Sequence, residues 1–201
     1  NGEKDGKWTT WYEDGQKSGE ETYKNGKNYG SSYSYDESGL IILEIKYDKN
    51  GKEIMWVEYN RLKTETILDD NGYPDIVKRY YKNGNLMFEI PWESGISKYW
   101  FDNGIKSHEG LLSINRLSEK DPNYYQNGKW TYWYTSGKKF REVEYDLCLL
   151  NNGYYLEEPI GIWKFWNEEG IQTYKVKFDS GSYGFVTIYD LINNDSVSYD
   201  K

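Results

Sequence analysis

The segment GKWTYWYTSG at Gly128–Gly137 decides how the whole sequence is interpreted, because similar ten-residue segments recur along it. Three clear copies read GKWTTWYEDG at Gly6–Gly15, GISKYWFDNG at Gly95–Gly104 and GIWKFWNEEG at Gly161–Gly170. Two weaker copies read GSSYSYDESG at Gly30–Gly39 and KTETILDDNG at Lys63–Gly72. Their closing glycines follow one another at spacings of 24, 33, 32, 33 and 33 residues. Periods of this length are typical of repeat proteins.

Each copy predicts a β-hairpin. The closing glycine follows Asp, Ser, Asn or Glu, and dipeptides such as Asp-Gly and Asn-Gly favour tight hairpin turns with positive φ angles. A second strand follows, which in the Gly128–Gly137 copy ends at Tyr145. Further Asn-Gly turns predict additional third strands at Glu53–Tyr59 and Leu86–Trp92.

The composition also favours β structure. The chain has 201 residues, of which 18% are aromatic, and it contains no alanine. Alanine is the best helix former, whereas Tyr, Trp, Thr and Val favour strands, so a helical ankyrin-type repeat is rejected. We therefore predict an all-β fold, an elongated open antiparallel β-meander of about six hairpin repeats. The units of this single repeat domain, 1–201, are expected at approximately 6–29, 30–62, 63–94, 95–127, 128–160 and 161–192. Two segments fit poorly and are expected to be loops or short helical turns, Leu111–Pro122 and Leu147–Pro159.

The sixth position of each copy forms a column without polar residues. It holds Trp11, Tyr35, Leu68, Trp100, Trp133 and Trp166. Because successive side chains of a strand point to opposite faces, the sixth position shares a face with the fourth and lies opposite the third, fifth and seventh. We interpret this column as the structural core, stacked from repeat to repeat, with Trp11, Leu68, Trp133 and Trp166 mostly buried.

The opposite face supplies the candidate binding residues. The aromatic side chains there are densest in the last three copies, and the predicted partner-binding patch consists of Tyr99, Trp130, Tyr132, Trp163 and Phe165. Contiguous exposed aromatic patches mark interaction sites, and Tyr and Trp are frequent interface anchors. The alternative is that these rings pack against the extra strands or stiffen the sheet.

The charge and the reactive side chains limit the possible functions. The formal net charge is −8 without a Lys/Arg run, which argues against nucleic-acid binding. It is compatible with a basic protein partner, or simply with solubility. The single histidine, His108, is expected to be partly buried on the face of Leu112, and the single cysteine, Cys148, is expected to be a small buried hydrophobe. No Cys/His cluster, phosphate loop or nucleophile motif is found, so no catalytic, metal or cofactor residues are predicted.

The GKW-x-x-WY-x-x-G segment and the strand that follows it resemble MORN-variant repeats. The resemblance is close at Gly6–Gly26 and Gly128–Tyr145, fair at Gly161–Phe178 and degenerate in the middle of the chain. It implies an open antiparallel β-meander. It also implies a bacterial origin and an antitoxin role, since bacterial members are often described as antitoxins of toxin–antitoxin systems. Repeat identity specifies a fold far better than a function.

The leading expectation is a non-enzymatic, antitoxin- or immunity-like module that holds a basic protein partner against an acidic, aromatic sheet face. The alternative is a cell-surface adhesin or glycan-binding repeat protein, in which rings stack on sugars. Accordingly, the compartment is expected to be either the cytoplasm or the bacterial cell surface. No apolar run approaches the roughly 20 residues that a membrane-spanning helix needs.

Overall fold

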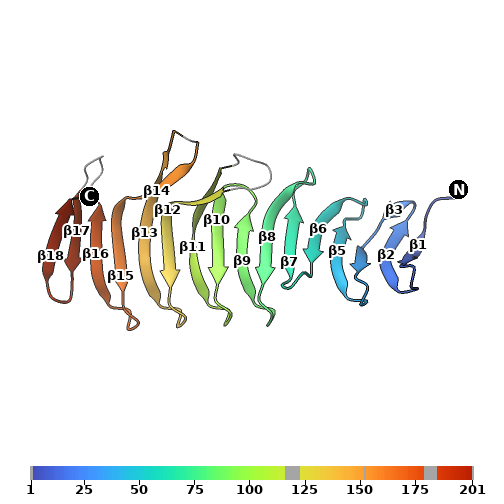
Figure 1. Cartoon of the computed structure of the whole chain (residues 1–201), viewed down its shortest axis with the longest axis horizontal. Coiled ribbons are helices and arrows are strands. Elements are labelled where there is room, and N and C mark those ends of the chain that lie inside the picture. The colour runs from blue at the N-terminus through green and yellow to red at the C-terminus, as the bar shows by residue number, and fades with distance from the viewer. Residues whose placement is uncertain (1, 116–122, 152, 179–184, 201) are drawn as a thin grey trace. The chain divides into compact units, whose positions relative to one another are not determined.

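The computed structural model describes residues 2–115, 123–151, 153–178 and 185–200, and throughout these ranges the regular structure consists of β-strands. Consecutive strands pair in antiparallel fashion (Figure 1). The expected all-β antiparallel meander is therefore confirmed. The described residues contain no helix that is long and apolar enough to cross a bilayer.

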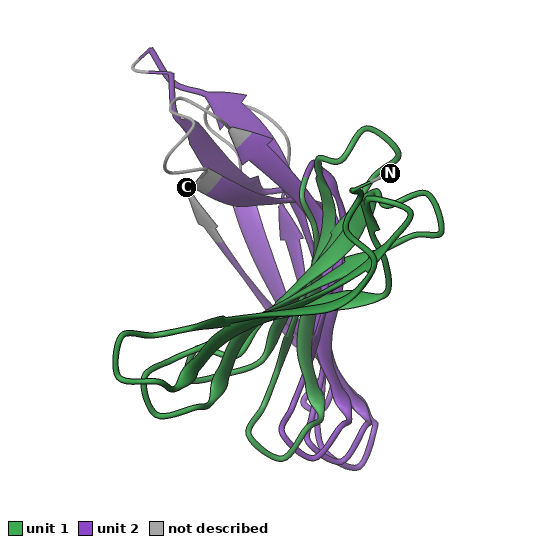
Figure 2. Ribbon diagram, turned by 90° about the vertical axis from the view of Figure 1, so that its right-hand side faces the viewer, with its two compact units in different colours: residues 1–92 green, residues 93–201 purple. Residues whose placement is uncertain are grey.

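The chain consists of two compact units, residues 1–92 (unit 1) and residues 93–201 (unit 2) (Figure 2). The strands of unit 1 are β1 Gly6–Trp11, β2 Lys17–Lys24, β3 Lys27–Asn28, β4 Ser31–Tyr35, β5 Ile41–Tyr47, β6 Glu53–Glu58, β7 Thr64–Leu68, β8 Pro74–Tyr80 and β9 Leu86–Pro91. Those of unit 2 are β10 Gly95–Trp100, β11 Lys106–Asn115, β12 Asn123–Trp133, β13 Lys139–Leu149, β14 Tyr155–Pro159, β15 Gly161–Trp166, β16 Gln172–Phe178, β17 Phe185–Asp190 and β18 Asp195–Asp200. Strand β13 pairs with both β14 and β15.

The closing glycines build the hairpin turns as the sequence predicts. All six have φ angles between 82° and 88°, a conformation that L side chains avoid. In the Gly128–Gly137 copy, the amide of Gly137 donates to the carbonyl of Tyr134 at 2.9 Å, and the amide of Tyr134 donates to the carbonyl of Lys138 at 2.8 Å. The same pair of bonds recurs in the other five copies. The turn is thus one repeated structure.

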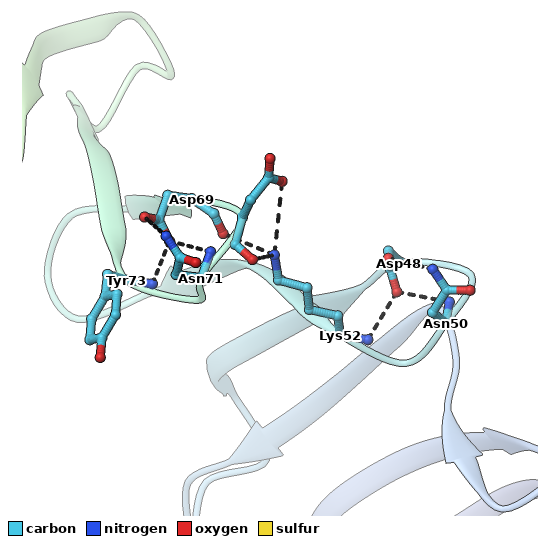
Figure 3. Close-up of polar contacts among 7 residues, drawn as sticks. Asp48, Asn50, Lys52, Asp69, Asn71 and Tyr73 are labelled. Carbon is cyan, nitrogen blue, oxygen red and sulfur yellow. Dashed lines mark hydrogen bonds and ion pairs between the residues drawn. The ribbon is translucent and has the colours of Figure 1, made fainter.

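Side-chain carboxylates stabilise several of these turns (Figure 3). The carboxylate of Asp69 accepts hydrogen bonds from the amides of Asn71 and Tyr73, both at 2.8 Å, and Asp48 caps the β5–β6 turn in the same way. These backbone donors hold the pKa values of both carboxyl groups below their ordinary range. Lys52 links the two turns, since its ammonium donates to the carbonyl of Asp69 at 3.1 Å.

A register shift follows the fifth position of every copy. In the β12–β13 hairpin, Tyr132 faces Arg141 while Trp133 faces Lys139, so Phe140 is the extra residue of a β-bulge. Equivalent shifts precede Trp11, Tyr35, Leu68, Trp100 and Trp166. The bulge and the positive-φ glycine together set the register of each hairpin.

The predicted third strands are confirmed as β6 and β9. Each belongs to a further bulged hairpin, with register shifts before Tyr47 and Tyr80. Because a repeat with a third strand contains an odd number of antiparallel strands, the first strand of the next repeat runs in the opposite direction. Third-position Ser32 accordingly lies in the same cross-strand row as fourth-position Thr66, so the sixth-position column changes face at Leu68.

The best-buried row of unit 2 runs across four strands. Ser97, Gly110, Trp130 and Val143 face one another in register on β10 to β13. Trp130 has 1% of its surface exposed and Val143 has 2%. A Cβ atom at Gly110 would lie 2.2 Å from the indole of Trp130. The indole therefore occupies the space that a side chain at position 110 would need.

The expected core column is wrong except at Leu68, which is 8% exposed. Trp11 is 62% exposed, and Trp133 and Trp166 are only half-buried. The face of unit 2 that carries Trp133 is polar, and we call it the charged face. There the ammonium of Lys106 lies 5.3 Å from the ring centre of Trp133, and that of Lys139 lies 5.0 Å from Trp166. Lysine ammonium groups thus lie over these half-buried rings.

Trp130 and Trp133, three residues apart on β12, should therefore contribute differently to stability. Trp130→Ala should lower the free energy of unfolding by about 3–5 kcal/mol, as for other fully buried large aromatics. Trp133→Ala should cost only about 1–2 kcal/mol, because it loses partial burial and a cation–π contact worth roughly 0.5–1 kcal/mol. Urea unfolding of both variants measures the difference. Equal losses would contradict this assignment of the two faces.

Gly110 should be required for the position of the Trp130 indole. Gly110→Ala should cost about 1–3 kcal/mol, typical of overpacking. In a Trp130→Val background, where the indole is absent, the same change should be nearly neutral. The coupling energy from this double-mutant cycle measures the contact. Additive losses in the double variant would show that Gly110 is needed for another reason.

Candidate functional site: a row of planar side chains in unit 2

The face opposite the charged face carries most of the aromatic side chains of unit 2, and we call it the ring face. Three of the five predicted binding residues, Tyr99, Tyr132 and Phe165, fall into one cross-strand row on it. The register of six strands places these side chains in line in the order Tyr99, His108, Tyr132, Arg141, Phe165 and Tyr174. We call this line the planar row.

The first four members of the planar row stack on one another. The rings of Tyr99 and His108 are 4.1 Å apart at an interplanar angle of 13°, and those of His108 and Tyr132 are 5.3 Å apart at 16°. The guanidinium carbon of Arg141 lies 4.0 Å from the ring centre of Tyr132. Each of these groups therefore covers a face of its neighbour in the row.

The other two predicted binding residues are placed differently. Trp130 was expected to be exposed and is instead the largest fully buried side chain of the described residues. Its indole donates to the carbonyl of Leu111 at 3.1 Å. Trp163 is half-buried, donates to the carbonyl of Glu144 at 3.0 Å and packs against Tyr145 and Phe178. The expected exposure of Trp130 is therefore wrong, and this residue belongs to the core.

The end of β13 and strand β14 form a segment beside the planar row that we call the extension. Leu147–Pro159 was expected to be a loop or helical turn, but it forms the end of β13 and strand β14, which stand out from the sheet (Figure 1). Strand β12 bends where Gly110 and Leu111 pair with Trp130 and Asn127. The remainder of Leu111–Pro122 is strand β11 as far as Asn115, and residues 116–122 lie outside the described ranges.

The extension contacts the planar row through Gln126. The side-chain amide of Gln126 donates to the hydroxyl of Tyr132 at 2.9 Å, and its backbone amide donates to Glu157 on β14. Glu157 is half-buried within this strand, in a segment that was expected to be a loop or helical turn. The hydroxyl of Tyr132 is thereby fixed from the side.

Burial shifts the pKa values of the groups in and near the row. It raises the pKa of Tyr99 to about 12, with smaller contributions from Tyr124 and Tyr132. It lowers the pKa of His108, and the charge of Arg141 lowers it further. His108 is half-buried on the face of Leu112, as predicted, and its Nδ1 lies 3.1 Å from the hydroxyl of Ser107. At neutral pH, His108 is therefore uncharged.

The tip of the β13–β14 hairpin is apolar and exposed. Leu149 is 61% exposed, Leu156 48% and Tyr154 46%. Cys148 is also exposed, so the expectation that it is buried is wrong. The reason is that β13 continues past the sheet and leaves both sides of its end uncovered. Within the described ranges no group of three or more His, Cys, Asp or Glu side chains is placed to hold a metal ion.

Sequence reasoning missed His108 and Arg141 as members of the row. The alternation of aromatic residues points only to the first strand of each copy. Arg141 comes opposite Tyr132 because Phe140 is the extra residue of the bulge. A bulge assigned from the turn glycine would have revealed this pairing, whereas the contact of β13 with β15 has no signal in the sequence.

The neutral state of His108 predicts a pH-dependent stability. The folded-state pKa lies below that of the unfolded chain, roughly 6.5, so the unfolded chain binds more protons as the pH falls through this value. The free energy of unfolding should be highest above pH 6.5 and should decrease below it. Urea unfolding of the protein and of His108→Phe, at several pH values between 5.5 and 7.5, measures the slope.

His108 is the only histidine of the chain, so the variant is a clean control. His108→Phe retains an aromatic ring in the row but cannot titrate, and its stability should be nearly constant over this range. An equal slope in both proteins would assign the pH dependence to other groups.

The MORN repeat variant pattern matches three segments of the chain, residues 4–25, 76–94 and 124–146. No curated protein matches the sequence. The first segment contains the hairpin β1–β2, and the third contains most of the hairpin β12–β13, where the ten-residue copy is clearest. The second contains most of β8 and all of β9, a hairpin that joins the second and third strands of its unit. Bulged hairpins similar to the MORN repeat variant therefore occur in both units.

Proposed function

We propose that the chain is a non-enzymatic protein-binding module and that its partner docks on the ring face of unit 2. The observation that carries this proposal is the planar row, six planar side chains in register on six strands. Three segments similar to a repeat class often involved in binding support it at the level of the class.

The planar row has the properties of an interface centre. Tyr and Arg are enriched among the residues that dominate binding energies. Stacking restrains the side chains before a partner arrives, which reduces the entropy lost on association. Tyr174, at the end of the row, is 44% exposed, and the apolar hairpin tip at Leu149 and Leu156 offers a second contact area.

We further propose an antitoxin- or immunity-like role, in which the partner is a basic protein that the module holds inactive. A net charge of −8 steers a basic partner and speeds its encounter with the module. Co-expression tests this finer proposal. A partner that stops growth alone, and is harmless together with the module, would support it.

The alternative, a glycan-binding surface protein, needs open ring faces on which sugar rings can stack. In the planar row the faces of His108 and Tyr132 are covered by neighbouring planar groups. This geometry favours contacts to ring edges, and therefore a protein partner rather than a sugar at this row.

Site-specific crosslinking tests the proposed binding face. A photoreactive phenylalanine analogue at Tyr174 should capture one protein from extracts of the source organism. The matched control carries the analogue at Tyr73, a turn residue of unit 1 that is 69% exposed, and should not capture it. Phe165→Ala should then weaken binding of the identified partner by about 2 kcal/mol or more, the usual hot-spot threshold.

Two results would contradict the proposal. Capture of the same protein from both positions would show non-specific contact. Unchanged affinity of Phe165→Ala, in a variant whose unfolding midpoint is also unchanged, would place the interface elsewhere.

A further inference from the structure

Arg141 is a charged side chain of the ring face for which the described residues supply no counter-ion. Its guanidinium contacts the rings of Tyr132 and Phe140, at 4.0 Å and 5.6 Å from their centres. Its Nε atom is buried and has no hydrogen-bond acceptor, and no carboxylate of the described residues lies within ion-pair distance. A buried cationic donor without an acceptor is costly.

The carboxylates near Arg141 either bind other groups or lie on the opposite face of the sheet. Glu142, the next residue, points to the charged face and binds Lys139 at 2.5 Å and Lys164 at 3.8 Å. Glu157, on the extension, accepts a hydrogen bond from the backbone amide of Gln126. The guanidinium of Arg141 is thus held in place by stacking, while its Nε donor has no acceptor among the described residues.

Arg79 in unit 1 provides the internal comparison. It also lies against an aromatic ring, 5.3 Å from the centre of Phe88. Its Nε atom, however, donates to the hydroxyl of Thr64 at 3.2 Å. The two arginines share the aromatic contact and differ in whether a cross-strand neighbour supplies an acceptor. Arg141 faces Tyr132 and Phe165 instead.

We propose that Arg141 is the binding site for a carboxylate, the side chain of an Asp or Glu in an exposed segment of the protein partner. The planar guanidinium donates two parallel hydrogen bonds to a carboxylate in a fixed geometry. Phe165 and Tyr174 follow Arg141 in the row, so the segment carries an apolar residue next to its acidic one. This inference rests on the proposed function and specifies the chemistry of its centre.

The charge of the protein favours a single carboxylate over a phosphate. The net charge of −8 repels polyanions such as nucleic acids and anionic membranes, and the site offers one cation. A single negative charge is matched by one guanidinium, whereas a phosphate dianion is not. The attraction of a basic partner by the whole surface is compatible with this local contact, because steering depends on the total charge and anchoring on the one desolvated pair.

Short peptides and the full 201-residue chain test the site. The probes are acetyl-Leu-Glu-Phe-amide, its Gln counterpart and its phosphoserine counterpart. The readout is the Nε–Hε resonance of Arg141 in ¹⁵N NMR spectra. The Glu peptide should shift this resonance saturably, and the Gln peptide should bind at least tenfold more weakly. Arg141→Gln, followed through backbone amides of β13, should lose the binding, and Arg141→Lys should weaken it at least threefold.

Arg79→Gln is the matched control, and it should bind the Glu peptide like the unaltered chain. Equal binding of the Glu and Gln peptides, or unchanged binding by Arg141→Gln, would overturn the proposal. Tighter binding of the phosphoserine peptide would replace the carboxylate by a phosphate. Failure of the binding function is distinguishable: if the crosslinked partner still binds Arg141→Gln but not Phe165→Ala, the carboxylate inference fails while the protein-binding function stands.

Discussion

The bulged hairpin turn is the constraint on which the rest of this structure depends. A glycine with positive φ closes each turn, and the extra residue that follows moves the second strand by one position relative to the first. Since a shift of one residue sends every side chain of a strand to the opposite face, this bulge decides which residues meet across the hairpin. Arg141 lies against Tyr132, and Lys139 beside Trp133, for this reason alone.

The faces of unit 2 show how a meander stabilises large rings. The few fully buried apolar side chains of the described part of unit 2 are Leu112, Trp130 and Val143. On the ring face, the indole of Trp130 is buried because the residue opposite it, Gly110, has no side chain. On the charged face, the ammonium groups of Lys106 and Lys139 lie over tryptophan rings and pair with Glu109 and Glu142. Rings and lysine side chains on neighbouring strands are therefore in contact with each other.

The sequence was sufficient for the fold class, the turn glycines and the extra strands, because these follow from local chemistry that recurs with a fixed period. It was insufficient for burial. Trp130 and Trp133 are equally apolar and lie three residues apart, and alternation correctly sends them to opposite faces. Which face is buried depends on Gly110, twenty residues away from Trp130, and on the extension of β11 to β14. Neither influence has a periodic pattern, and the planar row was recognised only through its first-strand members.

The same register that buries Trp130 also aligns the planar row two residues further along the strand. Ser97, Gly110, Trp130 and Val143 form one row, and Tyr99, His108, Tyr132 and Arg141 form the next. The first row is closed by packing. In the second, the planar groups stack on one another, so that neighbouring members cover each other's faces. Stability and the proposed recognition thus belong to adjacent rows of the same four strands, and the packing that holds unit 2 together also fixes the register of the row proposed to bind.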